Sequence, residues 1–465
     1  MKKWVSSIVS VTLALSLAAC SKTGGGAAGT SDTKPIDSSA KPIEAKPKDP
    51  VTIRITFQEG EMPKDQIAEF EQANPDIKIS REDIAPTKLA AELAANEAPD
   101  IIKVNGLTEV PSYVIRGVAM DLTSRFQTST LLKETDFLPV VDVYRFDGKE
   151  RGKGSIYGFP KDWSPDFTLW INKKAFEAAK VPLPDPAKQL TWEEILDLSK
   201  KLTIKNGDTY TQYGFVKSGG TELDLTVLMH YLLSKGVDPN SADFSSIDFT
   251  KPEVKEFAEL WNQFVQANVG PNSVNNFDKG IHPNDIFTNG KAAMTLKGYW
   301  FSGAMRDNEK AKTHLDDFIM LPPPIAKNGK FASPTGSATG AIINKKTKHP
   351  DEAWKVFEWF FGGKPAEVRA KSGYGVPALK HLVPALPQGT SFDKQTYQVL
   401  QDQLKYTGSN LSINPYLLNA DSIIGKDMAP YYFGKGTLDE SLANITKDAN
   451  NIIKESKSAI DSAKK

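Results

Sequence analysis

The first folded segment alternates strand-like and helix-like patterns, and this alternation restricts the fold more than any other feature. Residues 51–57 alternate β-branched and polar side chains, as a half-buried strand does. Residues 67–75 follow helical spacing and end at Asn-Pro, and 77–79 return to a period of two. Residues 89–93 mark another helix, and 101–104 form a short apolar run. This order predicts an α/β fold with a mostly parallel sheet and right-handed crossovers.

Polar residues follow two of these strands at their carboxyl ends. Gln58 and Glu59 come after the first strand, and Asn105 and Gly106 come after the third. Because α/β sheets bind ligands beyond the carboxyl ends of their strands, we expect Glu59 and Asn105 to face a ligand.

Chain length and net charge restrict the number of domains and the class of ligand to be expected for this chain. Residues 51–465 are more than one hydrophobic core usually organises, so two domains are expected. Lys and Arg number 57 and Asp and Glu also number 57, so there is no basic excess to attract nucleic acid.

The N-terminal segment has the layout of a secretory signal. Lys2 and Lys3 precede an apolar stretch at 4–17, which is shorter than the ~20 residues that cross a bilayer. Cys20 is the only cysteine, and Leu-Ala-Ala-Cys at 17–20 resembles the lipobox of bacterial lipoproteins. The resemblance implies that 1–20 is a lipoprotein signal peptide and that Cys20 carries a lipid. The alternative is a chance cysteine beside an ordinary cleavage site.

The segment that follows Cys20 is predicted to be a tether. Residues 21–50 are rich in Gly, Ser, Thr, Lys, Pro and Ala and contain no aromatic residue, a composition that cannot bury a core. Such a disordered segment has a root-mean-square reach of roughly 30 Å, so the folded part could move above the membrane while remaining attached.

Two turn-rich breaks divide the rest of the chain. The first, at 157–165, combines glycine and prolines with aromatic residues, and the second is Leu-Pro-Pro-Pro at 321–324. A glycine-rich loop at 335–340 then leads into an apolar strand. The stretch between the breaks is mainly helical, and Trp192 and Trp261 lie on apolar stripes typical of core packing.

At this point the chain resembles the family 1 extracellular solute-binding proteins, the sugar-binding lipoproteins of ATP-binding-cassette (ABC) importers, a family that includes maltose-binding protein. The resemblance covers nearly all of 51–465, with Trp170 at a position where the family usually has Tyr. Seven segments carry it, in the family's order: 99–102, 117–122, 157–160, 169–173, 191–194, 287–294 and 298–300.

The resemblance implies two α/β lobes of the periplasmic-binding-protein type, joined by a hinge that the chain crosses more than once. The N-terminal lobe would hold 51–160 plus 321–347, and the C-terminal lobe 161–320 plus 348–465. A carbohydrate would bind in the cleft and close the lobes. The implied protein is a monomer on the outer face of the cytoplasmic membrane, has no cofactor and no enzymatic activity, and passes its ligand to ABC permease subunits.

Sugar chemistry selects the candidate ligand-binding residues, because sugars need aromatic platforms and fixed polar groups. Trp300 lies where the family carries a stacking aromatic residue, and its alternative is core packing. Trp163 is a cleft platform or a hinge-packing residue, and Tyr374, between two glycines, is a platform or a turn residue.

Candidate partners for the sugar hydroxyls are polar residues in predicted loops. Glu59, Asn105, Asp162 and Glu222 are the main ones, with a solvated surface position as the alternative for each. Ser337 and the neighbouring backbone N–H groups would add hydrogen-bond donors for the sugar hydroxyls.

Two other functions remain as alternatives to sugar capture. The first is an anchored binder of another solute, such as a polyamine or a metal complex; unpaired carboxylates in the pocket would favour the polyamine. Ferric-ion binders of similar build use adjacent tyrosines, and Tyr431-Tyr432 is such a pair, although packing explains it better. The second is a surface glycoside hydrolase, which needs two opposed carboxylates.

Overall fold

The structure is a computed structural model of the 465-residue chain. Cys20, the predicted signal peptide and nearly all of the predicted tether lie outside the residues that it describes. The described residues are 49–207, 209–217, 222–275, 283–406, 411–417 and 420–463.

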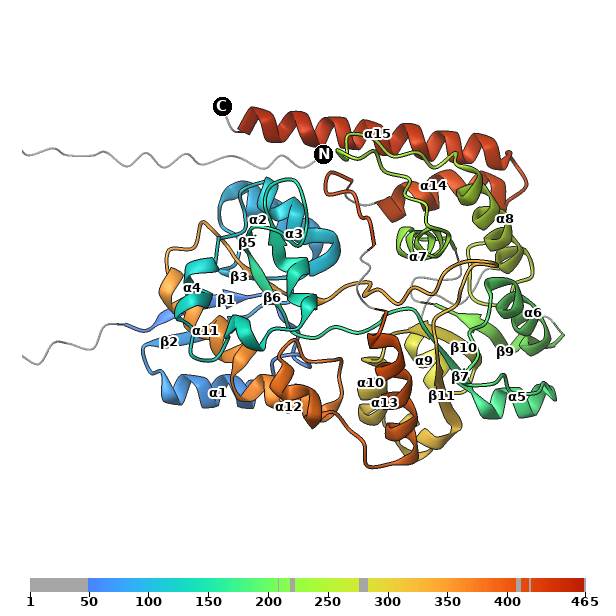
Figure 1. Ribbon diagram of the computed structural model, residues 1–465, viewed down its shortest axis with the longest axis horizontal. Coiled ribbons are helices and arrows are strands. Elements are labelled where there is room, and N and C mark those ends of the chain that lie inside the picture. Colours follow the sequence, from blue (N-terminus) through green and yellow to red (C-terminus); the bar gives the residue numbers. More distant parts are fainter. Residues whose placement is uncertain are drawn as a thin grey trace, which may run out of the picture. The chain divides into compact units, whose positions relative to one another are not determined.

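Five strands of the described chain form the first sheet, in the order β2-β1-β3-β12-β6 (Figure 1). Strand β1 pairs in parallel with β2 and β3, so the sequence-based prediction of a parallel arrangement in this segment is confirmed. Strand β12 returns from much later in the chain and runs antiparallel to both β3 and β6, which makes the sheet mixed. The bounds are β1 Val51–Ile55, β2 Ile77–Arg81, β3 Ile101–Asn105, β6 Gly158–Pro160 and β12 Thr339–Ile343.

Five described strands form the second sheet, in the order β11-β7-β10-β9-β8. Strand β7 runs antiparallel to β10 and β11, β9 runs parallel to β10, and β8 and β9 form an antiparallel pair. The two sheets therefore define two α/β lobes. The bounds are β7 Thr168–Asn172, β8 Ile204–Asn206, β9 Thr209–Val216, β10 Ala292–Lys297 and β11 Phe318–Leu321.

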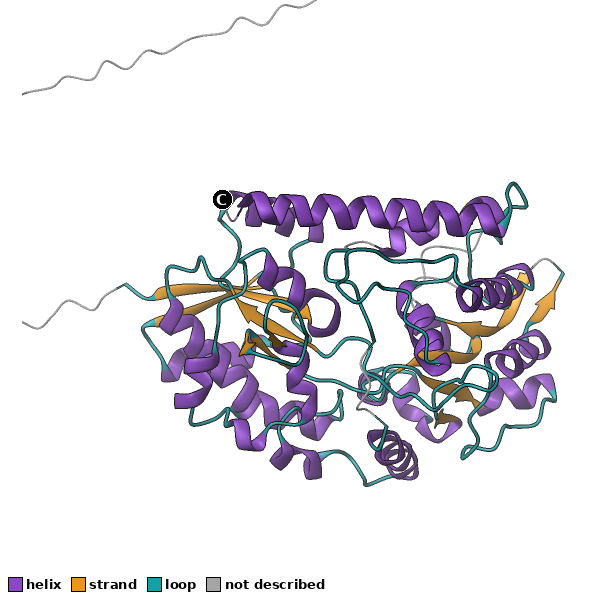
Figure 2. Ribbon diagram, turned by 45° about the horizontal axis from the view of Figure 1, so that its top comes forward, coloured by secondary structure: helices purple, strands orange, loops and turns teal. Residues whose placement is uncertain are grey.

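Helices flank both sheets (Figure 2). Their bounds are α1 Lys64–Ala73, α2 Pro86–Ala95, α3 Gly106–Ile115, α4 Thr123–Thr128, α5 Lys173–Ala179, α6 Trp192–Leu202, α7 Leu225–Lys235, α8 Pro252–Gln266, α9 Pro283–Thr288, α10 Phe301–Asp307, α11 Pro350–Gly362, α12 Lys364–Ser372, α13 Ser391–Leu404, α14 Ala420–Tyr432 and α15 Leu438–Ala463. A small two-stranded sheet joins β4 (Arg145–Phe146) and β5 (Ser155–Ile156), and the short 3₁₀ helices are η1 Glu134–Asp136, η2 Pro139–Tyr144, η3 Ala311–Thr313, η4 Leu315–Asp317 and η5 Lys380–Ala385.

The core of the second lobe contains the predicted tryptophan stripes. Trp192 begins α6 behind a capping box formed by Thr191 and Glu194. Its ring lies 5.3 Å from the ring of Trp261, and both side chains are fully buried. The prediction that these two tryptophans are core residues is confirmed.

Helix α11 lies on the first sheet, although the sequence analysis assigns residues 348–465 to the C-terminal lobe. The ring of Phe360 lies 4.7 Å from that of Phe57, just after β1, and Phe361 lies 5.9 Å from Phe159 of β6. The apolar face of α11 is thus buried against the N-terminal lobe, and 3₁₀ helix η5 contacts the same lobe through the bridge between Leu379 and Phe137. The predicted boundary at 348 does not match this packing.

Three segments of the described chain cross between the lobes, at 161–167, 322–338 and 386–390 (Figure 1). The predicted breaks at Pro160 and at 321–324 lie at the start of the first two crossings. An isolated bridge pairs Pro165 with Thr335, so these two crossings lie side by side. Within the described residues, no helix is both long and apolar enough to cross a membrane.

Candidate binding pocket between the two sheets

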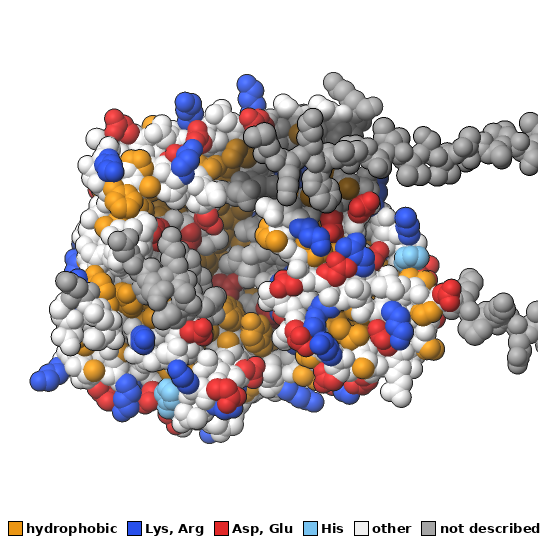
Figure 3. All heavy atoms as spheres, turned by 180° about the vertical axis from the view of Figure 1, so that it is seen from behind, with side chains coloured by type: hydrophobic (Ala, Val, Ile, Leu, Met, Phe, Trp, Pro, Cys, Tyr) orange, Lys and Arg blue, Asp and Glu red, His pale blue; other side chains and the backbone are white. Residues whose placement is uncertain are grey.

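A pocket of about 400 Å³ lies where strands of both sheets end, a volume within the usual range of small-molecule sites. The surface is hollowed between the lobes, and hydrophobic side chains gather on the walls (Figure 3). The described residues that line the pocket are Glu61, Lys103, Asn105, Lys161, Asp162, Asp166, Phe167, Lys217, Asp224, Thr226, Val227, Leu296, Lys297, Trp300, Gly336, Ser337, Thr339 and Tyr374.

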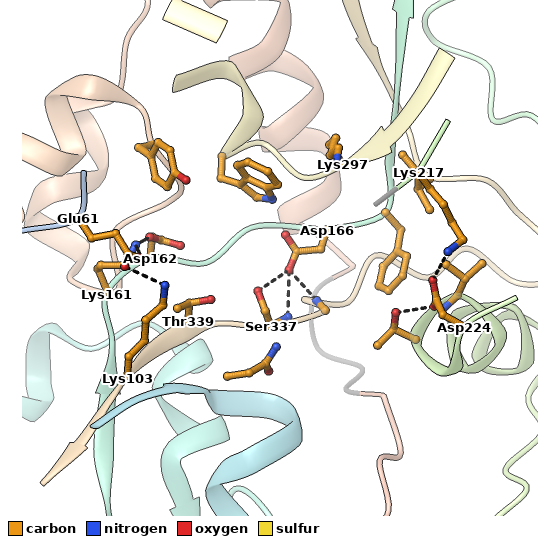
Figure 4. Close-up of a pocket in the computed structure, with 18 residues that line it drawn as sticks. Glu61, Lys103, Lys161, Asp162, Asp166, Lys217, Asp224, Lys297, Ser337 and Thr339 are labelled. Carbon is orange, nitrogen blue, oxygen red and sulfur yellow. Dashed lines mark hydrogen bonds and ion pairs between the residues drawn. The ribbon is translucent and has the colours of Figure 1, made fainter. Parts of the chain in front are cut away.

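An ion-pair network forms one end of the pocket (Figure 4). Glu61, in the turn after β1, lies 2.8 Å from the Nζ of Lys103 and 3.5 Å from the Nζ of Lys161. Lys161 also pairs with its neighbour Asp162. Burial opposes ionisation of Glu61, but the charges of Lys161 and Lys103 hold its pKa below the usual value.

Asp166 connects the first two crossings in the middle of the pocket (Figure 4). Its Oδ2 accepts hydrogen bonds from the backbone N–H groups of Gly336 and Ser337, at 2.8 and 3.0 Å, and from the hydroxyls of Ser337 and Thr335. Its Oδ1 accepts from the hydroxyl of Ser164 at 2.7 Å. Burial raises the pKa of Asp166, while the hydrogen bonds from Ser164, Gly336 and Ser337 oppose this rise.

Two lysines and an aspartate form the other end. Lys217 follows β9 directly, and its Nζ lies 2.7 Å from Asp224. Asp224 caps α7 by accepting from the N–H of Val227 at 2.8 Å. Lys297 is the last residue of β10, where burial and the charge of Lys217 lower its pKa to about 8.

Two aromatic rings contribute apolar surface to the pocket. Trp300 immediately precedes α10 and is partly buried, and Tyr374 follows the end of α12. The two ring centroids are 6.0 Å apart, with an interplanar angle of 45°. The Nζ of Lys161 lies 5.3 Å from the ring of Tyr374, and that of Lys297 lies 5.9 Å from the ring of Trp300. Burial raises the pKa of Tyr374 to about 12, so its hydroxyl is a donor at neutral pH.

The structure brings together five of the eight residues that the sequence analysis nominates for ligand binding, and these are Asn105, Asp162, Trp300, Ser337 and Tyr374. The strand-end argument places Asn105 correctly at the end of β3. Its side-chain oxygen accepts from the N–H of Thr108 and caps α3.

Three nominated residues do not line this pocket. Glu59 has a side chain that is 64% exposed and pairs with Arg81 at 3.0 Å. Trp163, in the first crossing, is buried against the segment at 376–377, where it forms a bridge with Val376 and its Nε1 donates to the carbonyl of Pro377 at 3.2 Å, so it is a packing residue. Glu222 accepts a hydrogen bond from the backbone N–H of Ser273.

Several charged pocket residues are missing from the sequence-based set, although a signal for two of them exists. Lys297 is the last residue of β10 and Lys217 directly follows β9, so both occupy the strand-end position that singles out Asn105. Glu61 lies two positions beyond the nominated Glu59, in the same turn. Asp166 has no comparable local signal, because its hydrogen-bond partners at 335–337 are distant in sequence.

Metal and tyrosine-pair sites are the remaining alternatives to test against this geometry. Among the residues described, no group of three or more His, Cys, Asp or Glu side chains is arranged to hold a metal ion. Tyr432 is buried, and its hydroxyl accepts from the N–H of Leu223 at 3.3 Å. Neither Tyr431 nor Tyr432 lines the pocket.

Two α/β lobes joined by several crossings, with a polar pocket between them, define a two-lobed ligand-binding protein. The family model for bacterial extracellular solute-binding proteins matches residues 58–365, which is well over half of the chain. The chain therefore belongs to this family of binding proteins, whose members are not enzymes. Among curated proteins, no sequence matches the chain.

Several solved structures have the same fold. An ABC substrate-binding protein from Listeria monocytogenes, in complex with cycloalternan, is 21% identical, with a TM-score of 0.70 over 87% of this chain and 98% of its own. An ABC transporter solute-binding protein from Thermotoga lettingae, bound to alpha-D-tagatose, is 18% identical, with a TM-score of 0.70 over 87% and 100%. A binding protein from B. animalis subsp. lactis, in complex with beta-1,6-galactobiose, is 19% identical, with a TM-score of 0.68 over 88% and 98%. At these identities the likeness establishes the fold.

Proposed function

We propose that this chain is the substrate-binding protein of an ABC transporter and that it captures a carbohydrate in the pocket between its lobes. Closure of the lobes around the sugar would present the loaded protein to membrane permease subunits. No chemical step on the ligand is required of the protein.

The observation that carries the proposal is the pairing of aromatic and polar surfaces in the pocket. Trp300 and Tyr374 offer ring faces for the C–H groups of a sugar, while Asn105 and Thr339 of the first sheet and Ser337 of the second crossing offer hydrogen-bonding groups. Sugars need both kinds of surface. Because Asn105 uses its oxygen as a helix cap, its amide nitrogen is the atom that would donate to a hydroxyl.

Carbohydrates are also the ligands in the related complexes. The proteins from Listeria monocytogenes, Thermotoga lettingae and B. animalis subsp. lactis hold cycloalternan, tagatose and galactobiose, respectively. These ligands range from one sugar to a cyclic oligosaccharide, so they support the class of ligand and leave its length open.

A polycationic ligand such as a polyamine fits less well. Such a ligand would need carboxylates to pair with its ammonium groups. Each carboxylate of the described pocket lining already has a partner: Glu61, Asp162 and Asp224 pair with lysines, and Asp166 accepts from the second crossing. The condition that would favour a polyamine is therefore not met.

The anchor completes the proposal and rests on the sequence. Cys20, with its lipobox-like context and the predicted 21–50 tether, would hold the protein on the outer face of the cytoplasmic membrane as a lipoprotein. A monomer on such a tether could reach its permease by moving in the plane of the membrane.

A thermal-shift panel of mono- and oligosaccharides tests the binding function. A sugar at 100 times its Kd stabilises the folded protein by about 2.7 kcal/mol, which raises its melting temperature measurably. Trp300→Ala should weaken the best ligand by roughly 2 kcal/mol, the range for losing an aromatic anchor. Trp354→Ala is the matched control, because Trp354 is also partly buried but lies on α11, outside the pocket. Stabilisation by polyamines and by no saccharide would refute the carbohydrate proposal.

A further inference from the structure

A second cavity lies within the N-terminal lobe, between α2 and α3, and we call it the α2–α3 cavity. Its volume of about 830 Å³ is about twice that of the pocket between the lobes and falls within the usual range of small-molecule sites. The two helices lie side by side in this lobe (Figure 1), and residues at the ends of β1 and β3 form the floor between them.

The α2–α3 cavity adjoins the pocket between the lobes along one strand edge. Lys103, Asn105 and Thr339 line both. They belong to the adjacent strands β3 and β12, in which Thr339 is paired with Asn105. A saccharide in the pocket is therefore separated from the cavity only by this edge, and a substituent on its ring could extend past Asn105 into the cavity.

Helix α2 gives the cavity an apolar wall that the protein itself leaves unburied. The residues of α2 that line the cavity are Leu89, Ala90, Leu93 and Ala94. None of the ten residues of α2 is buried. An ion pair at its edge holds the helix instead, with the Nη2 of Arg54 lying 3.2 Å from Glu92. Apolar surface in contact with water is unfavourable, so a hydrocarbon group that covered this wall would bind with a gain in free energy.

Helix α3 forms the opposite wall, and this wall is polar. Glu109, Ser112, Tyr113 and Arg116 recur at helical spacing, which places them on one face of α3 and its C-terminal cap. The backbone N–H of Asn105 donates to the Oε2 of Glu109 at 2.6 Å and fixes that carboxyl group. The other three side chains are hydrogen-bond donors. Burial raises the pKa of Tyr113, so its hydroxyl keeps its proton at neutral pH.

An aliphatic wall that faces a row of donors matches the chemistry of an acyl group. The carbonyl oxygen of an acyl group accepts hydrogen bonds, and its hydrocarbon part needs apolar contacts. An unsubstituted sugar ring matches less well, because its C–H faces pack best on aromatic rings. Tyr113 is the one aromatic residue among the described lining residues, and it lies on the polar wall. The shared strand edge indicates that the acyl group belongs to the saccharide and not to a separate molecule.

We propose that the α2–α3 cavity is a second subsite of the ligand pocket and that it holds the acyl group of an acylated saccharide. The hydrocarbon part packs on Leu89 and Leu93, and the carbonyl oxygen accepts a hydrogen bond from Tyr113. The inference rests on the proposed carbohydrate function and specifies the sugar by its substituent.

The experiment compares matched ligands of the purified chain by titration calorimetry. Maltose, mannobiose and galactobiose are each used unmodified, as mono-O-butanoyl esters and as mono-O-butyl ethers, with every positional isomer measured separately. The ether keeps the hydrocarbon chain and lacks the carbonyl oxygen. We expect at least one ester to bind at least about tenfold more tightly than its unmodified sugar, from burial of the hydrocarbon part, and more tightly than the ether of the same position.

Variants link this preference to the cavity. In Leu93→Gln the ratio of the dissociation constants of unmodified sugar and ester should fall toward one, and the variant should fold because α2 contributes no buried residue. Tyr113→Phe should weaken the ester about threefold to tenfold and leave the ether unchanged. Leu131→Gln is the matched control, because Leu131 is an exposed leucine of the same lobe outside the described lining of both cavities, and the ratio should stay at its wild-type value.

Each result has a defined meaning, and the wild-type comparison decides even where a variant does not fold. If no ester binds more tightly than its unmodified sugar, the acyl subsite is overturned and the carbohydrate function stands. Equal gains for esters and ethers would overturn the role of Tyr113 as donor. An ester preference that persists in folded Leu93→Gln and Tyr113→Phe proteins would overturn the assignment to this cavity. Binding of no saccharide in any form, here and in the wider panel, would refute the proposed function and this inference with it.

Discussion

Asp166 should be the residue on which the geometry of the hinge depends most. Its carboxylate accepts five hydrogen bonds from Ser164, Thr335, Gly336 and Ser337, and it thereby ties the first crossing to the second. Removing it leaves two backbone N–H groups and three hydroxyls without their acceptor. The 335–337 loop would then lose the contacts that hold it at the pocket wall.

The size of the effect follows from these contacts. Hydrogen bonds to a charged group contribute about 1.5–3 kcal/mol each when buried, and less where water can replace the acceptor. Because Asp166 lines the pocket, water reaches the site, and the hydroxyls can turn toward it. We therefore expect Asp166→Ala to lower the free energy of unfolding by about 2–4 kcal/mol, and Asp166→Asn, which keeps an acceptor, by about 1 kcal/mol.

Urea unfolding monitored by tryptophan fluorescence measures both variants. Glu309→Ala is the control, since its side chain is 85% exposed and its loss should change stability by no more than about 0.5 kcal/mol. Affinity for the best ligand should fall in Asp166→Ala as well, because Gly336 and Ser337 line the pocket. An Asp166→Ala protein within about 0.5 kcal/mol of the wild type would refute the claim that this carboxylate holds the crossings together.

Three further predictions test the core, the pH response and the anchor. Trp192→Ala should lower the free energy of unfolding by roughly 3–5 kcal/mol in urea titrations, because the side chain is fully buried against Trp261; a smaller loss than in Trp300→Ala would contradict this core assignment. Burial lowers the pKa of His230 to about 4, so the neutral ring contributes stability that is complete above pH 6.5 and is lost as the pH falls toward 4. Between pH 7 and pH 4 the wild type should therefore lose about 3 kcal/mol more than His230→Gln, and equal losses would show that this histidine does not titrate as inferred. Cys20→Ala should release a folded, ligand-binding protein from the membrane fraction, whereas retention of the variant after a high-salt wash would argue against lipid attachment at Cys20.

Local patterns in the sequence predict the strands of the first folded segment but not the placement of every helix. The alternation at 51–57 and the apolar run at 101–104 predict β1 and β3, because burial on one or both faces leaves a direct mark on residue type. The apolar face of α11 is equally clear, but periodicity says only that a face is buried. It does not say which sheet buries it, and the assignment of α11 to the C-terminal lobe was wrong for that reason.

The same limit applies to the pocket. Asn105 could be predicted because it ends a strand, whereas the choice between Glu59 and Glu61 depends on a turn. The N–H groups of Glu61 and Met62 both donate to the carbonyl of Gln58, and the folded loop directs Glu61 toward Lys103 and leaves Glu59 beside Arg81. Ion pairs between residues about a hundred positions apart, such as Glu61 and Lys161, exist only after the lobes have folded.

The Gly298-Tyr299-Trp300 segment shows how a sequence motif becomes interpretable once its surroundings are known. Gly298 lies directly after β10, and a Cβ atom at this position would collide with the Ser164 hydroxyl and the Asp166 carboxylate, and would lie 2.9 Å from the ring of Trp300. Only a residue without a side chain lets the end of β10 pass this closely to the carboxylate that joins the crossings. That close passage sets the start of α10, and with it the position of Trp300 beside Lys297. The absence of a side chain at Gly298 therefore lets the chain pass close to the hinge, and this passage places Trp300 in the lining of the pocket.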